Sequence, residues 1–302
     1  MDHSSNTYRN NPLVSIVIPA YKAEKYIEYA LESVRYQTYL NWELIVVEDG
    51  WRDQTEEIVN EFSKSVPSNK ILFIRHTLNR GLGATRNTAI KSASGTYIAL
   101  LDHDDVWKSD HLQKSILSLE NNQVDLTYSN VILIDEKGSE CGNLKPTQEE
   151  IVNFPASLYN RNYIVPSSTV FKKGSLERIG LFVENLRYHG CEDYACWIKM
   201  IRSGSQFLYL DNSSCFYRQH QEQLTFNMDK MLESVINVLQ ENKDWQIISK
   251  NVRSKRLFKI YYNLAKLSWK KNKGKSIKLY MHAWMIYPFD FFYHARKLAL
   301  LF

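Results

Sequence analysis

Short apolar runs alternate with amphipathic stretches over the first hundred residues of the chain. Four runs have the length and β-branched character of buried strands: Val14 to Ile18, Trp42 to Val47, Lys70 to Arg75 and Tyr97 to Leu101. The first run stops at Pro19, which predicts the end of that strand. The alternation of strands with helix-like stretches predicts an α/β fold, with a mostly parallel sheet and helices on both faces.

The stretches between these runs place apolar residues three and four positions apart, as a helix does. Helices are expected over Ala23 to Tyr36, Asp53 to about Phe62, Ala84 to Ala93 and Lys108 to Glu120. Asp53 is followed by Glu56 three residues later, a spacing typical of a capping box at a helix N-terminus.

The alternation breaks after residue 120. Leu126 to Ile134 and the turn at 135–138 predict a hairpin, and a strand is expected over Ile164 to Phe171, entered through Pro166. A helix is expected over 190–200, with Glu192 and Asp193 in its first turn, where free backbone N–H groups favour acids. Phe207 to Tyr217 alternates weakly, and from Met228 onward the pattern is helical.

Polar residues follow three of the predicted strands at what should be one edge of the sheet. The fourth strand runs into Asp102, Asp104 and Asp105, the second into Glu48 and Asp49, and the first into Pro19-Ala-Tyr21. Ligands of open α/β sheets bind at the carboxyl ends of the strands, and carboxylates suit Mg²⁺ or Mn²⁺ bridging to a diphosphate. The alternative is a solvated acidic turn, with Asp105 or Ser109 capping the next helix.

Composition narrows the class of protein. The 302 residues are 44% hydrophobic and 24% charged, which suffices for a sizeable core. We expect no secretory signal in the polar start, Met1 to Asn11, and no membrane-spanning helix, because no run of 18 apolar residues exists. The four cysteines lack the spacing of a zinc site and are expected to be free thiols.

The net charge of +5 conceals an asymmetry. Lys250 to Phe302 contains 13 Lys and Arg residues but one acid, Asp290, whereas the remainder of the chain is acidic. Such a tail favours an anionic partner surface. The basic and aromatic segment 266–302 can lie on an anionic membrane; alternatively, Tyr280, Trp284, Phe291 and Phe292 pack on the body or on a second subunit. No nucleic-acid partner is expected, because the body is acidic and no matching motif is present.

Five segments in order resemble the family 2 glycosyltransferases with the GT-A fold. They are Val14-Ser-Ile-Val-Ile-Pro-Ala-Tyr21, Val47-Glu-Asp-Gly50, Asn79-Arg-Gly-Leu-Gly-Ala-Thr-Arg-Asn87, Leu101-Asp-His-Asp-Asp-Val-Trp107 and Cys191-Glu-Asp-Tyr194. The resemblance runs from about Val14 to His220. Glu48 replaces the family's usual first Asp, and Trp51-Arg52 replaces its usual Ser-Thr.

The resemblance implies a role for each matched position. Asp193 would be the catalytic base. The nucleotide sugar would contact Pro19, Tyr21, Asp49, Arg86, Asp102 and His103. Asp104 would ligate Mn²⁺ or Mg²⁺, together with His220, which would close on the diphosphate. A divalent cation stabilises the charge that develops on a leaving diphosphate, and a carboxylate deprotonates the attacking hydroxyl.

The expected enzyme is an inverting, metal-dependent glycosyltransferase (hexosyltransferase). It would move a hexose from a UDP-sugar to a saccharide or lipid-linked saccharide in surface polysaccharide or lipopolysaccharide biosynthesis. One base without a nucleophile implies a single displacement. The alternatives are a nucleotidyltransferase, against which the glycine-free loop from Pro19 to Glu24 argues, and a non-catalytic sugar-nucleotide-binding scaffold.

The resemblance also implies a division of the chain. Residues 1–225 would form the GT-A domain, with a nucleotide-binding half at about 12–120 and an acceptor half at about 121–225. Residues 226–302 would form a basic, aromatic helical extension. The expected location is cytoplasmic, at the inner face of the cell membrane. The sugar, the acceptor and the oligomeric state do not follow from the sequence.

Overall fold

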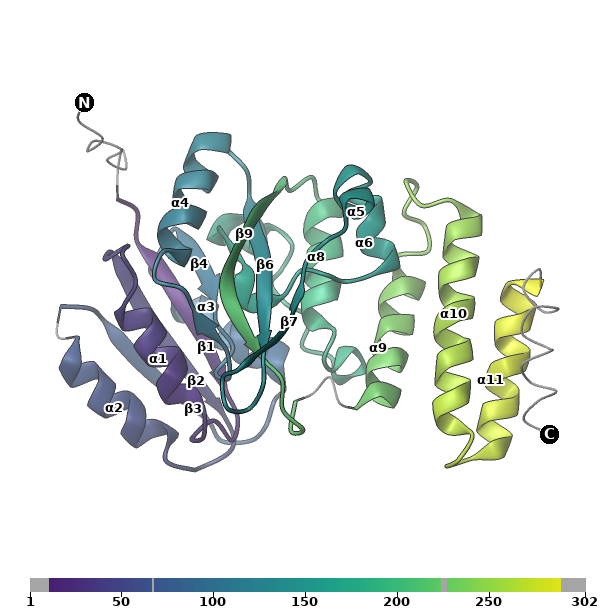
Figure 1. Cartoon of the computed structure of the whole chain (residues 1–302), viewed down its shortest axis with the longest axis horizontal. Helices are drawn as coiled ribbons and strands as arrows, with labels where there is room; N and C mark the ends of the chain where they lie inside the picture. The colour runs from purple at the N-terminus through teal and green to yellow at the C-terminus, as the bar shows by residue number, and fades with distance from the viewer. Residues whose placement is uncertain (1–10, 67, 224–226, 289–302) are drawn as a thin grey trace. The chain divides into compact units, whose positions relative to one another are not determined.

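The computed structural model describes residues 11–66, 68–223 and 227–288 (Figure 1). The expectation for the start of the chain, and those for Phe291, Phe292 and the rest of the tail beyond residue 288, lie outside these residues. The described residues form two compact units. One contains residues 11–152, 162–184 and 192–221, and the other contains 153–161, 185–191 and the chain from 222 onward.

The first unit is built on one mixed sheet. Within the described residues its strands are β1 (Val14–Ala20), β2 (Trp42–Asp49), β3 (Ile71–His76), β4 (Tyr97–Leu100), β5 (Val106–Trp107), β6 (Leu126–Ile134), β7 (Glu140–Leu144), β8 (Val170–Lys172) and β9 (Phe207–Arg218). Their order is β3-β2-β1-β4-β8-β6-β9-β5, and β7 pairs with β6. The first four strands in that order are parallel; β8 runs antiparallel to both neighbours, and β9 runs parallel to β6.

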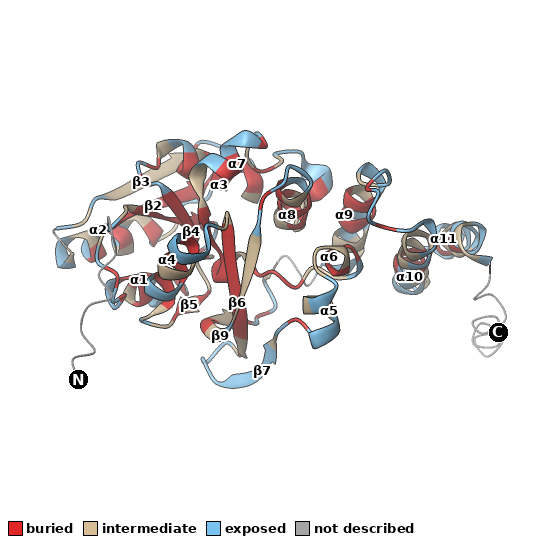
Figure 2. Ribbon diagram, turned by 90° about the horizontal axis from the view of Figure 1, so that it is seen from above, coloured by how far each residue is buried: buried red, intermediate tan, exposed pale blue. Residues whose placement is uncertain are grey.

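Helices cover both faces of this sheet. They are α1 (Ile27–Arg35), α2 (Thr55–Ser65), α3 (Leu82–Ser92), α4 (His111–Asn122), α5 (Gln148–Val152), α7 (Lys173–Arg178) and α8 (Glu192–Arg202), with a 3-10 turn at Pro166–Ser168. Figure 2 shows α1, α2 and α4 on one side of β1, β2 and β4, and α3 and α7 on the other. The predicted layered α/β arrangement is therefore present.

The central strands are buried on both faces. Every residue of β1, β2 and β4 is buried, which explains why these segments read as continuous apolar runs rather than alternating ones. Ile16, Ile18, Leu44 and Val46 are completely inaccessible. Each such branched side chain contributes roughly 1.5–3 kcal/mol when it leaves water. This packing fixes the strand ends that carry the polar residues.

Some predicted boundaries were wrong. Pro19 does not end the first strand: it lies within β1 beside Val47, and β1 continues to Ala20. The first helix begins at Ile27 rather than at Ala23. Pro166 opens a 3-10 turn, and the strand begins only at Val170. The missing N–H of proline suits the first position of such a turn.

The predicted cap of α2, and the cap of α4 that the alternative of an acidic turn implied, were also wrong. The N-cap of α2 is Gln54, and Asp53 instead accepts a hydrogen bond from the Thr55 N–H at 2.9 Å. The N-cap of α4 is Asp110, so neither Asp105 nor Ser109 caps that helix. Asp105 is fully buried, and its hydrogen bonds go to Ser167 and to the backbone of Arg218 instead.

The second unit is helical. It contains α6 (Ala156–Asn160), a 3-10 turn at Leu186–Tyr188, α9 (Met228–Glu241), α10 (Lys250–Ser268) and α11 (Lys273–Ile286). The α10 and α11 helices lie side by side (Figure 1), and the buried Ser276 hydroxyl donates to the Ala265 carbonyl at 2.7 Å. Within the part of the chain that the structure describes, no helix combines the length and apolar character needed to cross a bilayer.

Candidate active site

The loops after β1 and β4 meet at the carboxyl edge of the sheet. Pro19 lies near the end of β1, and the Pro19 carbonyl oxygen is 3.2 Å from Nδ1 of His103, which follows β4. Tyr21 follows β1 and is 40% exposed. Lys22 has a φ of 53°, in the left-handed region that residues with a side chain rarely adopt. Two predicted nucleotide-binding positions, Pro19 and His103, are thus in contact.

The acidic loop after β4 meets the end of β9. Asp104 Oδ2 lies 2.9 Å from Nε2 of His220, which brings the two predicted metal ligands together across 116 residues of sequence. Asp105 accepts a hydrogen bond from the backbone N–H of Arg218 at 3.0 Å and another from the Ser167 hydroxyl. The loop and the end of β9 are therefore held as one piece.

The pKa values of Asp104 and Asp105 are shifted in opposite directions. Burial by itself would raise the pKa of Asp104, but the charge of His103 and the hydrogen bond from His220 hold it below the usual value. Burial raises the pKa of Asp105 well above its usual value, and the charges of Asp104 and Asp102 raise it further. Asp104 is thus the more acidic of the two, whereas Asp105 anchors the loop through its bonds to Ser167 and Arg218.

Asp104 and His220 could ligate a divalent cation whose remaining ligands are diphosphate oxygens and water. Carboxylate oxygen and imidazole nitrogen suit Mn²⁺, and the side chains of Asp104 and His220 remain 14% and 7% exposed. Within the described residues, no group of three or more His, Cys, Asp or Glu side chains is arranged to hold a metal ion. Cations in nucleotide sites commonly take one or two protein ligands and complete their shell with phosphate oxygens and water.

A buried arginine joins the acidic loop to α8. The Arg86 side chain on α3 is only 1% exposed, and it donates to Asp102 and to Glu192, each at 2.7 Å. Gly83 lets α3 pack closely against the backbone at Val183, because a Cβ at position 83 would come within 2.2 Å of the Val183 carbonyl oxygen. Both hydrogen-bonded acids are fixed by a single guanidinium group, whose planar fork suits such pairing.

The predicted base lies beside this bridge. Asp193 follows Glu192 in the first turn of α8 and accepts a hydrogen bond from the Asn162 amide at 3.1 Å. Burial raises the pKa of Asp193 to about 7, and the adjacent Glu192 raises it while Arg86 lowers it. A carboxylate with a pKa near neutrality can both accept and release a proton.

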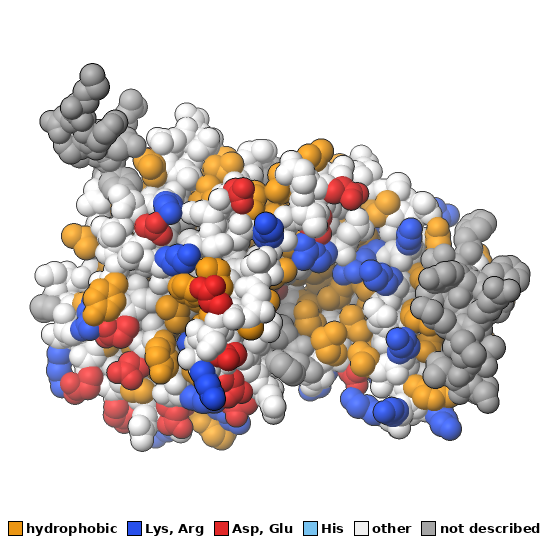
Figure 3. Space-filling model, in the orientation of Figure 1, with side chains coloured by type: hydrophobic (Ala, Val, Ile, Leu, Met, Phe, Trp, Pro, Cys, Tyr) orange, Lys and Arg blue, Asp and Glu red, His pale blue; other side chains and the backbone are white. Residues whose placement is uncertain are grey.

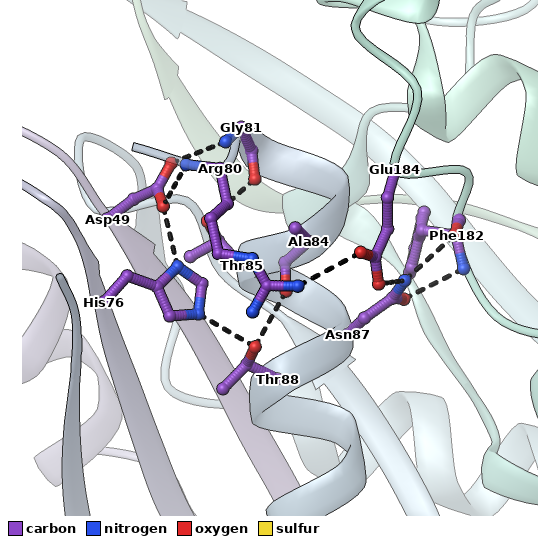
Figure 4. Close-up of polar contacts among 10 residues, drawn as sticks. All are labelled: Asp49, His76, Arg80, Gly81, Ala84, Thr85, Asn87, Thr88, Phe182 and Glu184. Carbon is purple, nitrogen blue, oxygen red and sulfur yellow. Dashed lines mark hydrogen bonds and ion pairs between the residues drawn. The ribbon is translucent and has the colours of Figure 1, made fainter. Parts of the chain in front are cut away.

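Asp49 occupies a different position in the network (Figure 4). Its carboxylate accepts from the backbone N–H groups of Arg80 and Gly81 at 2.9 and 2.8 Å, and lies 2.7 Å from Nδ1 of His76. The other ring nitrogen of His76 lies 2.9 Å from the Thr88 hydroxyl. Asp49 therefore holds the turn that precedes α3.

Glu48 and Trp51, at the two departures from the family motif, each contact neighbouring side chains. Glu48 forms an ion pair with Arg75, which lies opposite it on β3. The Glu48 side chain is one methylene longer than that of the Asp it replaces. Trp51 is 42% exposed and packs edge-to-face with Tyr21, with 5.9 Å between ring centroids. The ammonium group of Lys22 lies 4.5 Å from the centre of the Trp51 ring.

The comparisons with known proteins fit this geometry. The family described as "Glycosyl transferase family 2" matches residues 15–180. This range is more than half of the chain and includes the carboxyl ends of β1 and β4. The chain belongs to glycosyl transferase family 2. The predicted enzyme class, a glycosyltransferase, is thereby confirmed.

Relatives in the family include two Escherichia coli enzymes. The chain is 33% identical over 227 residues to WfaP, covering 75% of this chain and 85% of that protein, and 31% identical over 253 residues to WfgD, covering 83% and 91%. Each is named a UDP-Glc:alpha-D-GlcNAc-diphosphoundecaprenol beta-1,3-glucosyltransferase.

Solved structures confirm the predicted GT-A fold. A Staphylococcus aureus TarS fragment in complex with UDP-GlcNAc superposes with a TM-score of 0.63 at 17% identity, covering 89% of this chain and 90% of that chain. The Pyrobaculum calidifontis mannosyltransferase PcManGT, in complex with GDP-Man and Mn²⁺, gives 0.61 at 19% identity, covering 79% of this chain and 65% of that chain. At these identities the likeness concerns the fold alone.

Sequence reasoning missed several residues of the site. Asn162 and His76 lie in segments without any motif, so no signal in one sequence could find them. Ser167 is the exception: it is fully buried within the polar run Ser167-Ser-Thr169, which lies between apolar segments, and a buried hydroxyl requires a partner. The Ser167 oxygen accepts from the Asp102 N–H at 3.0 Å.

Proposed function

We propose that the protein transfers a hexose from a UDP-sugar to a hydroxyl of a saccharide on a lipid carrier, with inversion, in surface polysaccharide biosynthesis. The observation that carries this proposal is the Arg86 bridge, which ties Asp102 at the strand edge to the turn of α8 that bears Asp193. The WfaP and WfgD names support the substrate classes. Residues 1–225 would carry the reaction and 226–302 the helical extension.

The assigned roles follow the strand ends. Asp193 takes the proton of the acceptor hydroxyl as its oxygen attacks the anomeric carbon, and the bond from that carbon to the diphosphate breaks to release UDP. The donor nucleotide would be held by Pro19, Tyr21, Asp49, Arg86, Asp102 and His103. Asp104 and His220 would hold the divalent cation, which when bound supplies positive charge to the leaving diphosphate.

Inversion follows from the number of bases. Glu192 is buried and binds Arg86 through one carboxylate oxygen, so we assign the single displacement to Asp193. The two relatives support this: their names give UDP-Glc as the donor and a β-1,3 linkage in the product, and the glucose of UDP-glucose is α-linked. We propose an acceptor anchored in the cell membrane and an enzyme that meets it at the inner face, through the region 266–302.

Titration calorimetry of UDP, with and without Mn²⁺, tests the donor site. Wild-type protein should bind UDP with Mn²⁺ and lose roughly tenfold or more of that affinity as Asp104→Ala, because the cation loses its anionic ligand. Asp110→Ala is the matched control, since the Asp110 side chain is 41% exposed and pairs with Lys114 on the surface. Mn²⁺-independent UDP binding would contradict the metal assignment, and absence of any nucleotide binding would contradict the donor site itself.

A further inference from the structure

The outward face of α11 carries an apolar stripe. Ile277, Met281 and Met285 are spaced by four residues, so they lie along one side of the helix, and they are 49%, 57% and 69% exposed. The opposite side, with Ser276 and Ala283, is buried against the neighbouring helix. The helix thus has a second apolar side that its packing on α10 does not use.

Lysines border this stripe without acids to neutralise them. Lys273 lies one turn before Ile277, and Lys278 lies beside it; within the described part of the chain neither makes an ion pair. From Lys250 to Pro288 the sequence has no Asp or Glu. Figure 3 shows Lys and Arg side chains together with apolar ones over the neighbouring helix α10.

The lysines on the side of α9 behave differently. Lys271 pairs with Asp229 at 2.5 Å and Lys275 with Glu233 at 2.8 Å, both acids being on α9. The positive charge of this helical unit is therefore compensated toward α9 and uncompensated beside Ile277, Met281 and Met285. A surface that contacts this stripe meets apolar side chains together with positive charge that no carboxylate of the described residues neutralises; the Lys273 ammonium lies over the Trp269 ring, 5.8 Å from its centre.

We propose that this face, defined by Lys273, Ile277, Lys278, Met281 and Met285, is a docking surface for an anionic lipid bilayer. Each lysine close to an anionic membrane contributes about 1 kcal/mol, and inserted apolar side chains add to this. A stable contact with a second copy needs about 800 Å² from each partner, far more than three side chains along roughly 12 Å of helix offer. A bilayer requires no such matching surface.

The proposal sharpens the membrane association assigned above to residues 266–302, and it rests on the proposed function only for the lipid carrier. It assigns the contact to side chains of α11 itself. Binding to lipid can therefore be measured without a sugar donor or an acceptor. Failure of the donor site leaves this proposal intact, and failure of lipid binding leaves the donor site intact.

Co-sedimentation of the full chain with vesicles tests the surface. Wild-type protein should bind phosphatidylglycerol-containing vesicles and bind those of pure phosphatidylcholine roughly tenfold less or weaker, because the lysines find no anionic partner there. The double variant Met281→Glu/Met285→Glu and the double variant Lys273→Glu/Lys278→Glu should each lose roughly tenfold or more of the anionic-vesicle binding. High salt should weaken wild-type binding.

The matched control is Ile247→Glu, which adds an acid at another exposed apolar residue of the same unit, 53% exposed, and should bind as wild type. Thermal melting and UDP titration of each variant confirm that it is folded. Unchanged vesicle binding by both double variants would overturn the proposal. So would equal binding to both vesicle types, or a dimer that Met281→Glu/Met285→Glu dissociates without changing lipid binding.

Discussion

Asp193, the proposed base, has a strongly shifted pKa. Its carboxyl is half-buried beside Glu192 and Arg86, and loss of water contact is the main reason why its pKa lies at about 7. The same environment that makes Asp193 a suitable base makes its ionised form costly to the fold. Two predictions follow from this opposition, one on rate and one on stability.

The rate should follow the ionisation of Asp193. Because the base must be deprotonated, kcat/KM should rise tenfold per pH unit below about pH 7 and level off above it. Asp193→Asn should lose roughly 10²-fold or more of the activity at every pH. Initial rates of UDP release from pH 5 to 9 (roughly) would measure both effects. Retention of activity by Asp193→Asn would reject Asp193 as the base.

The stability effect has the opposite sign. The folded-state pKa of Asp193 is raised, so ionising it costs stability as pH rises from its unfolded value near 3.8 to about 7, and the full cost persists above. Asp193→Asn should therefore raise the free energy of unfolding by roughly 1–3 kcal/mol at about pH 8. At about pH 4 the gain should vanish. Urea unfolding at both pH values measures this, and a gain at neither would contradict it.

At the scale of elements, the junction of α3 with α8 is held by charge rather than by apolar packing alone. Arg86 is the cation between Asp102 and Glu192, and its side chain is only 1% exposed. Removing one partner of a buried ion pair leaves the others without compensation. The cost should far exceed that of breaking a pair at the surface.

Arg86→Ala should lower the free energy of unfolding by roughly 3–5 kcal/mol, and Arg86→Lys by less, because lysine keeps the charge but not the fork. The control is Arg80→Ala, just before the same helix. The Arg80 side chain is 51% exposed and pairs with Glu184 at 3.2 Å, so its loss should cost about 0–1 kcal/mol. Denaturant melts of the three variants compare these values, and equal costs for Arg86→Ala and Arg80→Ala would refute the argument.

The element scale also shows what the sequence could predict. Long buried strands such as β1 and β2 were found because burial on both faces leaves an uninterrupted apolar run. Their ends were predicted less well: Pro19 reads as a terminator, yet it lies inside β1, where pairing with Val47 and burial outweigh the missing N–H. Local propensity cannot report such tertiary compensation.

The whole molecule explains why only part of the site was predictable. Motifs located Asp104, His220 and Asp193, because each stands in a short segment with its own pattern. The partners of these residues come from distant segments: Asn162 reaches Asp193, and Ser167 connects Asp102 to Asp105. Such pairings depend on the three-dimensional path of the chain, which one sequence does not reveal.

The placement of β9 between β6 and β5 affects how the chain acquires its activity during synthesis. The four parallel strands, β1 to β4, are complete by residue 100, but Asp104 and Asp105 find His220 and Arg218 more than 110 residues later. Closing so long a loop is slow compared with forming local contacts. A chain still on the ribosome at residue 200 contains the four parallel strands but lacks His220, so on the roles proposed above we expect no transfer until the sheet is finished.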